Sequence, residues 1–110
     1  ERLGGKKRWI AFHHLPHGKI VVDPGAAKAL VKQGSSLLPA GILAVKGRFT
    51  EGDMVQVISE DGLELARGLV NYSSDDLEKI AGCTTHEIEN RLGYKYYDEA
   101  IHRDNLVVSP

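Results

Sequence analysis

The spacing of apolar residues changes several times along the chain, and each change predicts a structural element. Short β-branched runs and apolar–polar alternation with a period of two are typical of β-strands. They predict strands over residues 19–22, 45–49, 54–59 and 63–72, followed by one or two strands within 101–108. In the segment 63–72 the leucines alternate mainly with small or acidic residues. Asp61 and Gly62 stand between two predicted strands and indicate a tight hairpin turn.

A first helix is predicted directly after the first strand. Asp23 can cap exposed backbone amides, and Pro24 suits the first helical position because its missing N–H is not needed there. The apolar spacing continues to Gln33, and Gly34 can adopt the left-handed conformation that ends a helix. We therefore expect a helix of about three turns that ends at Gly34.

Two further short helices are predicted after the fourth strand. Ser73 or Ser74 caps a helix that continues to residue 80, and a glycine two residues later closes it. Thr84 and Glu87, three residues apart, form a capping box for another helix, which Gly93 closes. The total is a mainly β domain with short helices, an α+β fold. Because the strands are short and closely spaced, a small closed or partly closed barrel would protect their edges.

Composition supports one folded domain. The chain has 110 residues, of which 42% are hydrophobic and 26% charged, as in ordinary globular proteins. Residues 1–8, which include a Lys-Lys-Arg run, are interpreted as a linker, and 9–110 as the domain. No apolar run is long enough to cross a bilayer, so we expect no membrane partner. Cys83 is the only cysteine, which excludes an internal disulfide and favours a cytoplasmic location.

The chain starts at Glu1, and its only methionine is Met54, so we expect it to be a piece of a longer protein. Charge is distributed unevenly along it. Residues 1–50 hold nine basic and two acidic residues, a formal charge of +7, whereas 51–110 hold five basic and thirteen acidic residues, a charge of −8. A basic segment can serve phosphate recognition, although the two halves can also neutralise each other in the folded protein.

Two sets of residues have the types that a metal or catalytic site uses but lack the further groups that such a site needs. His13, His14 and His17 share a loop but lack a thiolate or a well-placed fourth ligand, so we expect no metal site there. Cys83 and His86 have the spacing of a thiolate–imidazole pair, but no third group is present to orient them. A half-buried structural cysteine is the better interpretation. The nucleotide-binding glycine motifs are absent, so the chain alone is expected to be non-catalytic and without a cofactor.

The most informative stretch is the first helix and the loop that follows it. Lys28 and Lys32 are four residues apart and therefore share one face of the helix. The loop 35–41 adds two hydroxyls and a glycine that permits close backbone approach. These groups can line a phosphate backbone. The alternative is a basic helix end followed by a well-packed loop, and the residues alone favour that alternative.

Several motifs in this order resemble a known family. Residues 20–57 are similar to the opening of a PUA domain, a small pseudo-barrel module of RNA-modifying enzymes, and read IVVDPGAAKALVKQGSSLLPAGILAVKGRFTEGDMVQV. Four further segments resemble the C-terminal PUA domain of the bacterial glutamate 5-kinase family. They are KRWI at 7–10, YSSDDLEKIAG at 72–82, EIENRLGY at 87–94 and AIHRDNLV at 100–107.

This resemblance implies a parent kinase that phosphorylates glutamate with ATP and Mg²⁺ in the first step of proline biosynthesis, and that is expected to be a homo-oligomer. The partner of the domain would be the kinase domain of the same chain, and its role regulatory. The alternative partner is RNA, which PUA relatives contact through the first helix and the following loop. The corresponding residues here are Lys28, Lys32, Ser35, Ser36, Leu38 and Gly41, with Arg103 as a neighbour. No aromatic residue in the loop is available to stack on a base.

Overall fold

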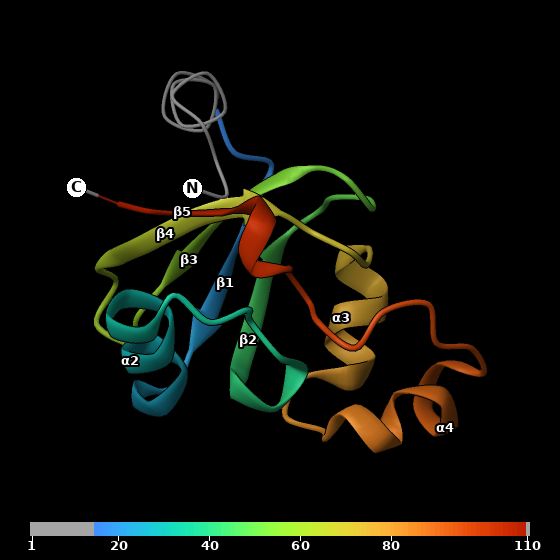
Figure 1. The fold of residues 1–110 in the computed structure, drawn as a ribbon. Helices are drawn as coiled ribbons and strands as arrows, with labels where there is room; N and C mark the ends of the chain where they lie inside the picture. Colours follow the sequence, from blue (N-terminus) through green and yellow to red (C-terminus); the bar gives the residue numbers. More distant parts are fainter. Residues whose placement is uncertain (1–14, 110) are drawn as a thin grey trace.

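The computed structural model describes residues 15–109 and consists of one five-stranded sheet with helices packed on it (Figure 1). The predicted linker 1–8 and His13 and His14 lie outside the described residues. The strands are β1 (Gly18–Val22), β2 (Ile42–Gly47), β3 (Met54–Ile58), β4 (Glu64–Leu69) and β5 (Leu106–Val108). Their order in the sheet is β2-β1-β3-β4-β5. β1 and β3 are parallel, and the other neighbours are antiparallel.

The helices are α2 (Pro24–Gln33), α3 (Ser74–Ile80) and α4 (Ile88–Leu92), with 3₁₀ turns at Pro39–Gly41, Thr85–Glu87 and Arg103–Asn105. Their ends confirm the signals in the sequence. The Ser73 hydroxyl accepts a hydrogen bond from the amide of Asp76, so Ser73 is the cap of α3. The Glu87 carboxylate accepts the backbone amide of Thr84 at 2.9 Å, and Gly93 ends α4 in the left-handed conformation. None of the helices within residues 15–109 could cross a membrane.

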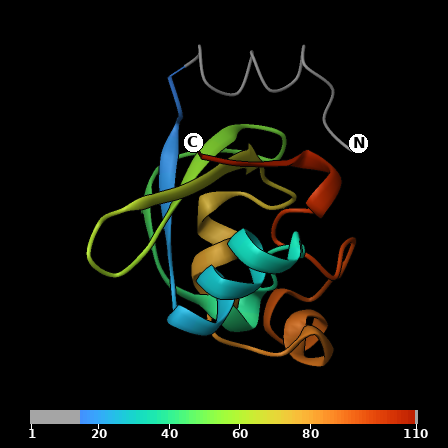
Figure 2. The same cartoon turned by 60° about the vertical axis from the view of Figure 1, so that its left-hand side comes forward.

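The hydrophobic core lies between the sheet and the helices, which Figures 1 and 2 show with α2 and α3 on the same side of the sheet. Ile20 and Val57 of the sheet and Leu30, Leu77 and Ile80 of the helices are almost completely buried in one continuous cluster. Alternate residues of each strand face this cluster and the others face outward, as the period of a strand requires. The sheet therefore has an inner, apolar face and an outer face.

An isolated β-bridge joins two segments that are far apart in the sequence. Leu37, in the chain after α2, pairs with Ile101, in the chain before β5, as an antiparallel bridge. The amide of Leu37 donates to the carbonyl of Ile101 at 2.9 Å, and the amide of Ala100 donates to the carbonyl of Leu37 at 2.7 Å. The bridge thus links the loop after α2 to the segment before β5, within the predicted α+β fold.

Two predicted strands differ from the structure. The strand predicted over 45–49 starts three residues earlier, at Ile42, and ends at Gly47, while Phe49 is buried outside it. The strand predicted over 63–72 is shorter, and its small residues face the core. Leu63 and Leu69 are 64% and 43% exposed, whereas Gly68 is buried. A Cβ on Gly68 would lie 2.7 Å from the carbonyl oxygen of Asn105, so the segment before β5 leaves no room for a larger residue at this position.

The hairpin between β3 and β4 is confirmed, but its turn is not an Asp-Gly pair with two positive φ angles. Only glycines have positive φ among the described residues, and Gly62 (φ 88°) is one of them. The amide of Ser59 donates to the carbonyl of Leu63 at 2.9 Å, which encloses the loop 60–62. This is the three-residue hairpin loop with glycine in the left-handed position. The segment 101–108 contains the bridge residue Ile101, a 3₁₀ turn and the single strand β5.

Candidate functional site

The helix α2 is fixed at both ends by the residues that the sequence indicated. The Asp23 carboxylate accepts the amide of Ala26 at 2.7 Å, and Gly34 (φ 64°) ends the helix. Lys28 and Lys32 are exposed on it, and neither forms an ion pair with any residue of the described part of the chain. Both ammonium groups are therefore accessible to an anion in solvent.

The loop 35–41 is held against the start of α2 and against the opposite end of the chain. The amide of Asp23 donates to the carbonyl of Gly41 at 3.0 Å. Gly41 itself lies so close to the helix that a Cβ on it would be 2.5 Å from the Cβ of Ala26. Ser35 is half-buried, whereas the side chain of Leu38 is 44% exposed. The fold thus fixes the loop backbone and leaves Leu38 at the surface.

The segment that contains Arg103 is bonded to the loop 35–41 through Ser36. The Ser36 hydroxyl accepts a hydrogen bond from the backbone amide of Arg103 at 2.7 Å, beside the 3₁₀ turn that Arg103 begins and that the His102 side chain caps. Arg103 is exposed, and the bridge between Leu37 and Ile101 holds the two segments side by side. The predicted residues thus lie on α2, on the loop after it and on the segment bonded to that loop, while their joint role as a binding surface stays a prediction. The set consists of Lys28, Lys32, Ser35, Ser36, Leu38, Gly41 and Arg103. We call it the α2 surface.

Cys83 does not pair with His86 in a reactive site. Its side chain is only 1% exposed and belongs to the core, whereas His86 is exposed. Burial raises the pKa of the Cys83 thiol, which keeps it protonated and poorly nucleophilic. Cys83 is thus a structural cysteine, but it is fully buried and not half-buried as expected. Within residues 15–109, no group of three or more His, Cys, Asp or Glu side chains is placed to hold a metal ion.

Sequence reasoning missed a second set of basic residues on the outer face of the sheet. Lys19 in β1 and Lys46 in β2 lie opposite each other in the register of the two strands. They are 27 positions apart in the sequence, and only the strand pairing brings them together. Alternation along a strand fixes the side to which each lysine points, but no local pattern indicates which strands are neighbours.

Comparison with protein-family models decides the family. A model described as "PUA domain" matches residues 18–92, which contain β1 to β4 and the helices α2, α3 and α4. The chain belongs to the PUA-domain family. Among solved structures, this PUA domain is similar to a crystal structure of a PUA domain from Aeropyrum pernix K1, in a tartrate complex. The two share a TM-score of 0.60 and 28% identity, over 79% of this chain and 41% of that one.

Curated relatives add a narrower likeness. The PUA domain is 60% identical, over 96% of its length, to a glutamate 5-kinase of Caldanaerobacter subterraneus subsp. tengcongensis. It is 55% identical, over 98% of its length, to a glutamate 5-kinase of Geobacter sulfurreducens. The chain spans only 28% and 29% of the length of these two relatives. The fold also resembles that of the archaeal box H/ACA sRNP Nop10-Cbf5 complex, with a TM-score of 0.54, 22% identity and coverage of 88% of this chain and 24% of that one.

Proposed function

We propose that this PUA domain is the non-catalytic, C-terminal regulatory domain of a cytoplasmic glutamate 5-kinase. The observation that carries the proposal is the 60% identity to such a kinase over 96% of this chain. The parent would phosphorylate glutamate with ATP and Mg²⁺ in proline biosynthesis and would be a homo-oligomer. Its catalytic and ATP-binding groups would lie in the remainder of the parent, which is the partner of this domain.

The experiment compares the full-length parent with a variant from which the PUA domain is removed. We expect the variant to keep phosphorylating glutamate, but with a changed KM for glutamate or a changed response to the end product of the pathway. The isolated PUA domain should form no γ-glutamyl phosphate. Glutamate-dependent ATP turnover by the isolated domain would overturn its non-catalytic assignment. Identical kinetics of the two parent forms would overturn the regulatory role.

RNA binding through the α2 surface is the second candidate. It is supported by the hydrogen bond from the backbone amide of Arg103 to the Ser36 hydroxyl, which links the segment of Arg103 to the loop that follows Lys28 and Lys32. Three cations on one surface can neutralise several phosphates of an RNA backbone. Non-specific binding of this kind has a Kd of about 10⁻⁴–10⁻⁶ M at physiological salt and weakens steeply as salt rises.

The test of RNA binding uses the double variant Lys28→Ala/Lys32→Ala. Each lost phosphate contact should lower the slope of log K against log salt by roughly one, so the double variant should bind a structured RNA more weakly and with a flatter dependence on salt. Lys79→Ala, a single exposed lysine at the end of α3, is the control and should leave the slope unchanged. Binding by the double variant that equals that of the unmodified domain would exclude the α2 surface as an RNA site.

A further inference from the structure

The outer face of the sheet carries an uncompensated pair of positive charges. Lys19 and Lys46 are directly opposite each other, and both are exposed. Neither ammonium forms an ion pair with any residue among 15–109. Like charges at directly opposite positions of a sheet destabilise the fold. The lysine pair thus opposes folding, and a bound anion would remove the repulsion.

The lysine pair borders a hollow of about 310 Å³, which Pro16 and two glycines also line. His17 and Gln56 line it with the two lysines, and Gln56 lies beside Lys19 in the register of β1 and β3. Gly18 and Gly47, which also line it, oppose each other in the register of β1 and β2. A Cβ on Gly18 would lie 2.6 Å from the carbonyl oxygen of Lys46, so glycine is required for this close approach of the strands.

Glu64, the acidic side chain bonded to Gln56, is already engaged. The Glu64 carboxylate accepts the Arg67 Nε–H at 3.1 Å and also accepts hydrogen bonds from Gln56 and Ser109. Burial works to raise its pKa, but these hydrogen bonds outweigh burial and hold the pKa of Glu64 below its usual value. Glu64 is therefore ionised and paired with Arg67, and its charge does not balance that of the lysine pair.

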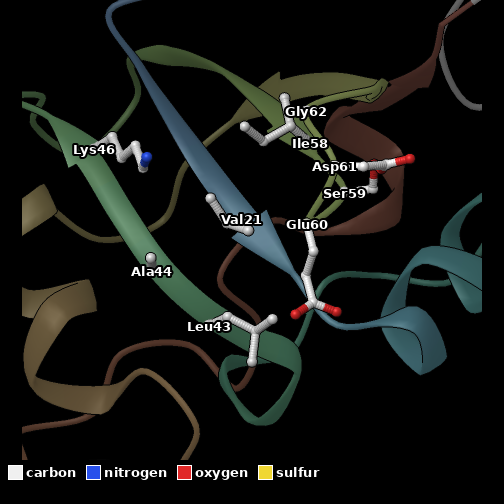
Figure 3. Close-up of a pocket in the computed structure, with 9 residues that line it drawn as sticks. All are labelled: Val21, Leu43, Ala44, Lys46, Ile58, Ser59, Glu60, Asp61 and Gly62. Carbon is white, nitrogen blue, oxygen red and sulfur yellow. The ribbon is translucent and has the colours of Figure 1, made fainter.

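A second hollow of about 510 Å³ adjoins the first one, and Lys46 lines both. Figure 3 shows its floor, formed by Val21 of β1, Ala44 of β2 and Ile58 of β3, with Lys46 at one end. Glu60 and Asp61 line this hollow from the loop between β3 and β4. The outer face thus presents a cationic end, an apolar middle and an acidic end in one line.

We propose that the outer face binds a small organic phosphate, with its phosphate between Lys19 and Lys46 and an apolar or aromatic body over Val21, Ala44 and Ile58. A lysine ammonium binds phosphate as a point charge, and two of them match a dianion. Val21 is two residues beyond Lys19, about 6.5 Å along the strand, which is the length between a phosphate and the ring of a small ligand attached to it. The acidic end disfavours a second anionic group there and so fixes the orientation.

This site differs from the α2 surface in position and in chemistry. Lys28 and Lys32 belong to a helix that packs on the inner face of the sheet, whereas the lysine pair lies on the outer face. The apolar floor beside the pair favours a compact ligand with one charged end over a long polyanion. The proposal therefore stands or falls independently of RNA binding by the α2 surface.

The test is titration of the 110-residue chain with adenosine 5′-monophosphate (AMP), inorganic phosphate, adenosine and a short single-stranded RNA, followed by amide NMR shifts. We expect AMP to bind more tightly than phosphate or adenosine and to shift the amides of Gly18, Lys19, Lys46 and Gly47. Lys46→Gln should weaken AMP binding about tenfold, as expected for the loss of one charge-assisted hydrogen bond. Lys79→Gln, which changes the net charge equally, is the control and should bind like the unmodified chain.

Two further measurements separate a binding site from ordinary surface lysines. Without ligand and at low salt, Lys46→Gln should raise the Tm, because it removes the repulsion from Lys19, whereas Lys79→Gln should not. Ile58→Thr should weaken AMP binding but leave phosphate binding unchanged, because it alters only the apolar floor. The proposal is overturned if 10 mM AMP shifts none of the four amides, if Lys46→Gln binds AMP as well as the unmodified chain, or if RNA occupies this face more tightly than AMP.

Discussion

Gly41 lies directly against Ala26 of α2, so closely that a Cβ on Gly41 would be 2.5 Å from the Cβ of Ala26. This contact sets the path of the loop that completes the α2 surface. We expect Gly41→Ala to destabilise the domain by about 1–3 kcal/mol, because an added methyl in a close-packed contact forces the backbone apart. Urea unfolding measures the change. Gly25→Ala is the matched control, since its Cβ would meet nothing closer than 3.4 Å, and it should be neutral or stabilising.

The Ser36 hydroxyl accepts a hydrogen bond from the backbone amide of Arg103, the first residue of a 3₁₀ turn. Ser36→Ala removes the acceptor for the Arg103 amide, so we expect a loss of about 0.5–1.5 kcal/mol and a large change in the NMR shift of that amide. Ser35→Ala provides the comparison, because the Ser35 hydroxyl has no hydrogen bond with the described residues. Equal effects of the two substitutions would show that Ser36 does not position Arg103.

Glu64 makes the stability of the domain depend on pH. Its pKa in the folded state is lowered from the model-peptide value of 4.5 by hydrogen bonds that outweigh burial. A lowered folded pKa stabilises the fold above the unfolded pKa, and this contribution disappears as pH falls through the folded pKa. Glu64→Gln should therefore be less stable than the unmodified domain at pH 7, and the difference should shrink below about pH 4.5. Urea midpoints measured between pH 7 and pH 3 test this, and a constant difference would contradict it.

Cys83 should be unreactive in the folded domain. Its thiol is buried in the core, and burial raises its pKa, so both access and thiolate content are low. We expect labelling by iodoacetamide at pH 8 to be at least tenfold slower in buffer than in 6 M guanidinium chloride, with a rate set by opening of the fold. Equal rates in the two solutions would mean that the segment between α3 and α4 is open in the native state.

Local signals in the sequence determined the positions of the helices and most of the strands. Asp23 and Gly34 delimit α2, and Thr84 and Gly93 delimit the last helical segment, because capping depends on residues only a few positions apart. The motifs of the loop 35–41 also pointed to the PUA family. The predicted strand boundaries were wrong where a residue bonds to a distant segment of the chain. Phe49 is an example, because its amide donates to the Ser74 hydroxyl.

Only the tertiary structure decided which residues share a surface. Ser36 and Arg103 are 67 positions apart, and they meet because Leu37 and Ile101 form a bridge that no local pattern encodes. The side of β4 that faces the core likewise depends on a tertiary contact. Asn105 and Ile101 lie so close to Gly68 that no side chain fits there. Lys19 and Lys46 face each other because β1 pairs with β2 in one particular register. Alternation along a strand fixes the side to which a residue points, but strand pairing is a long-range choice that depends on how the whole core packs.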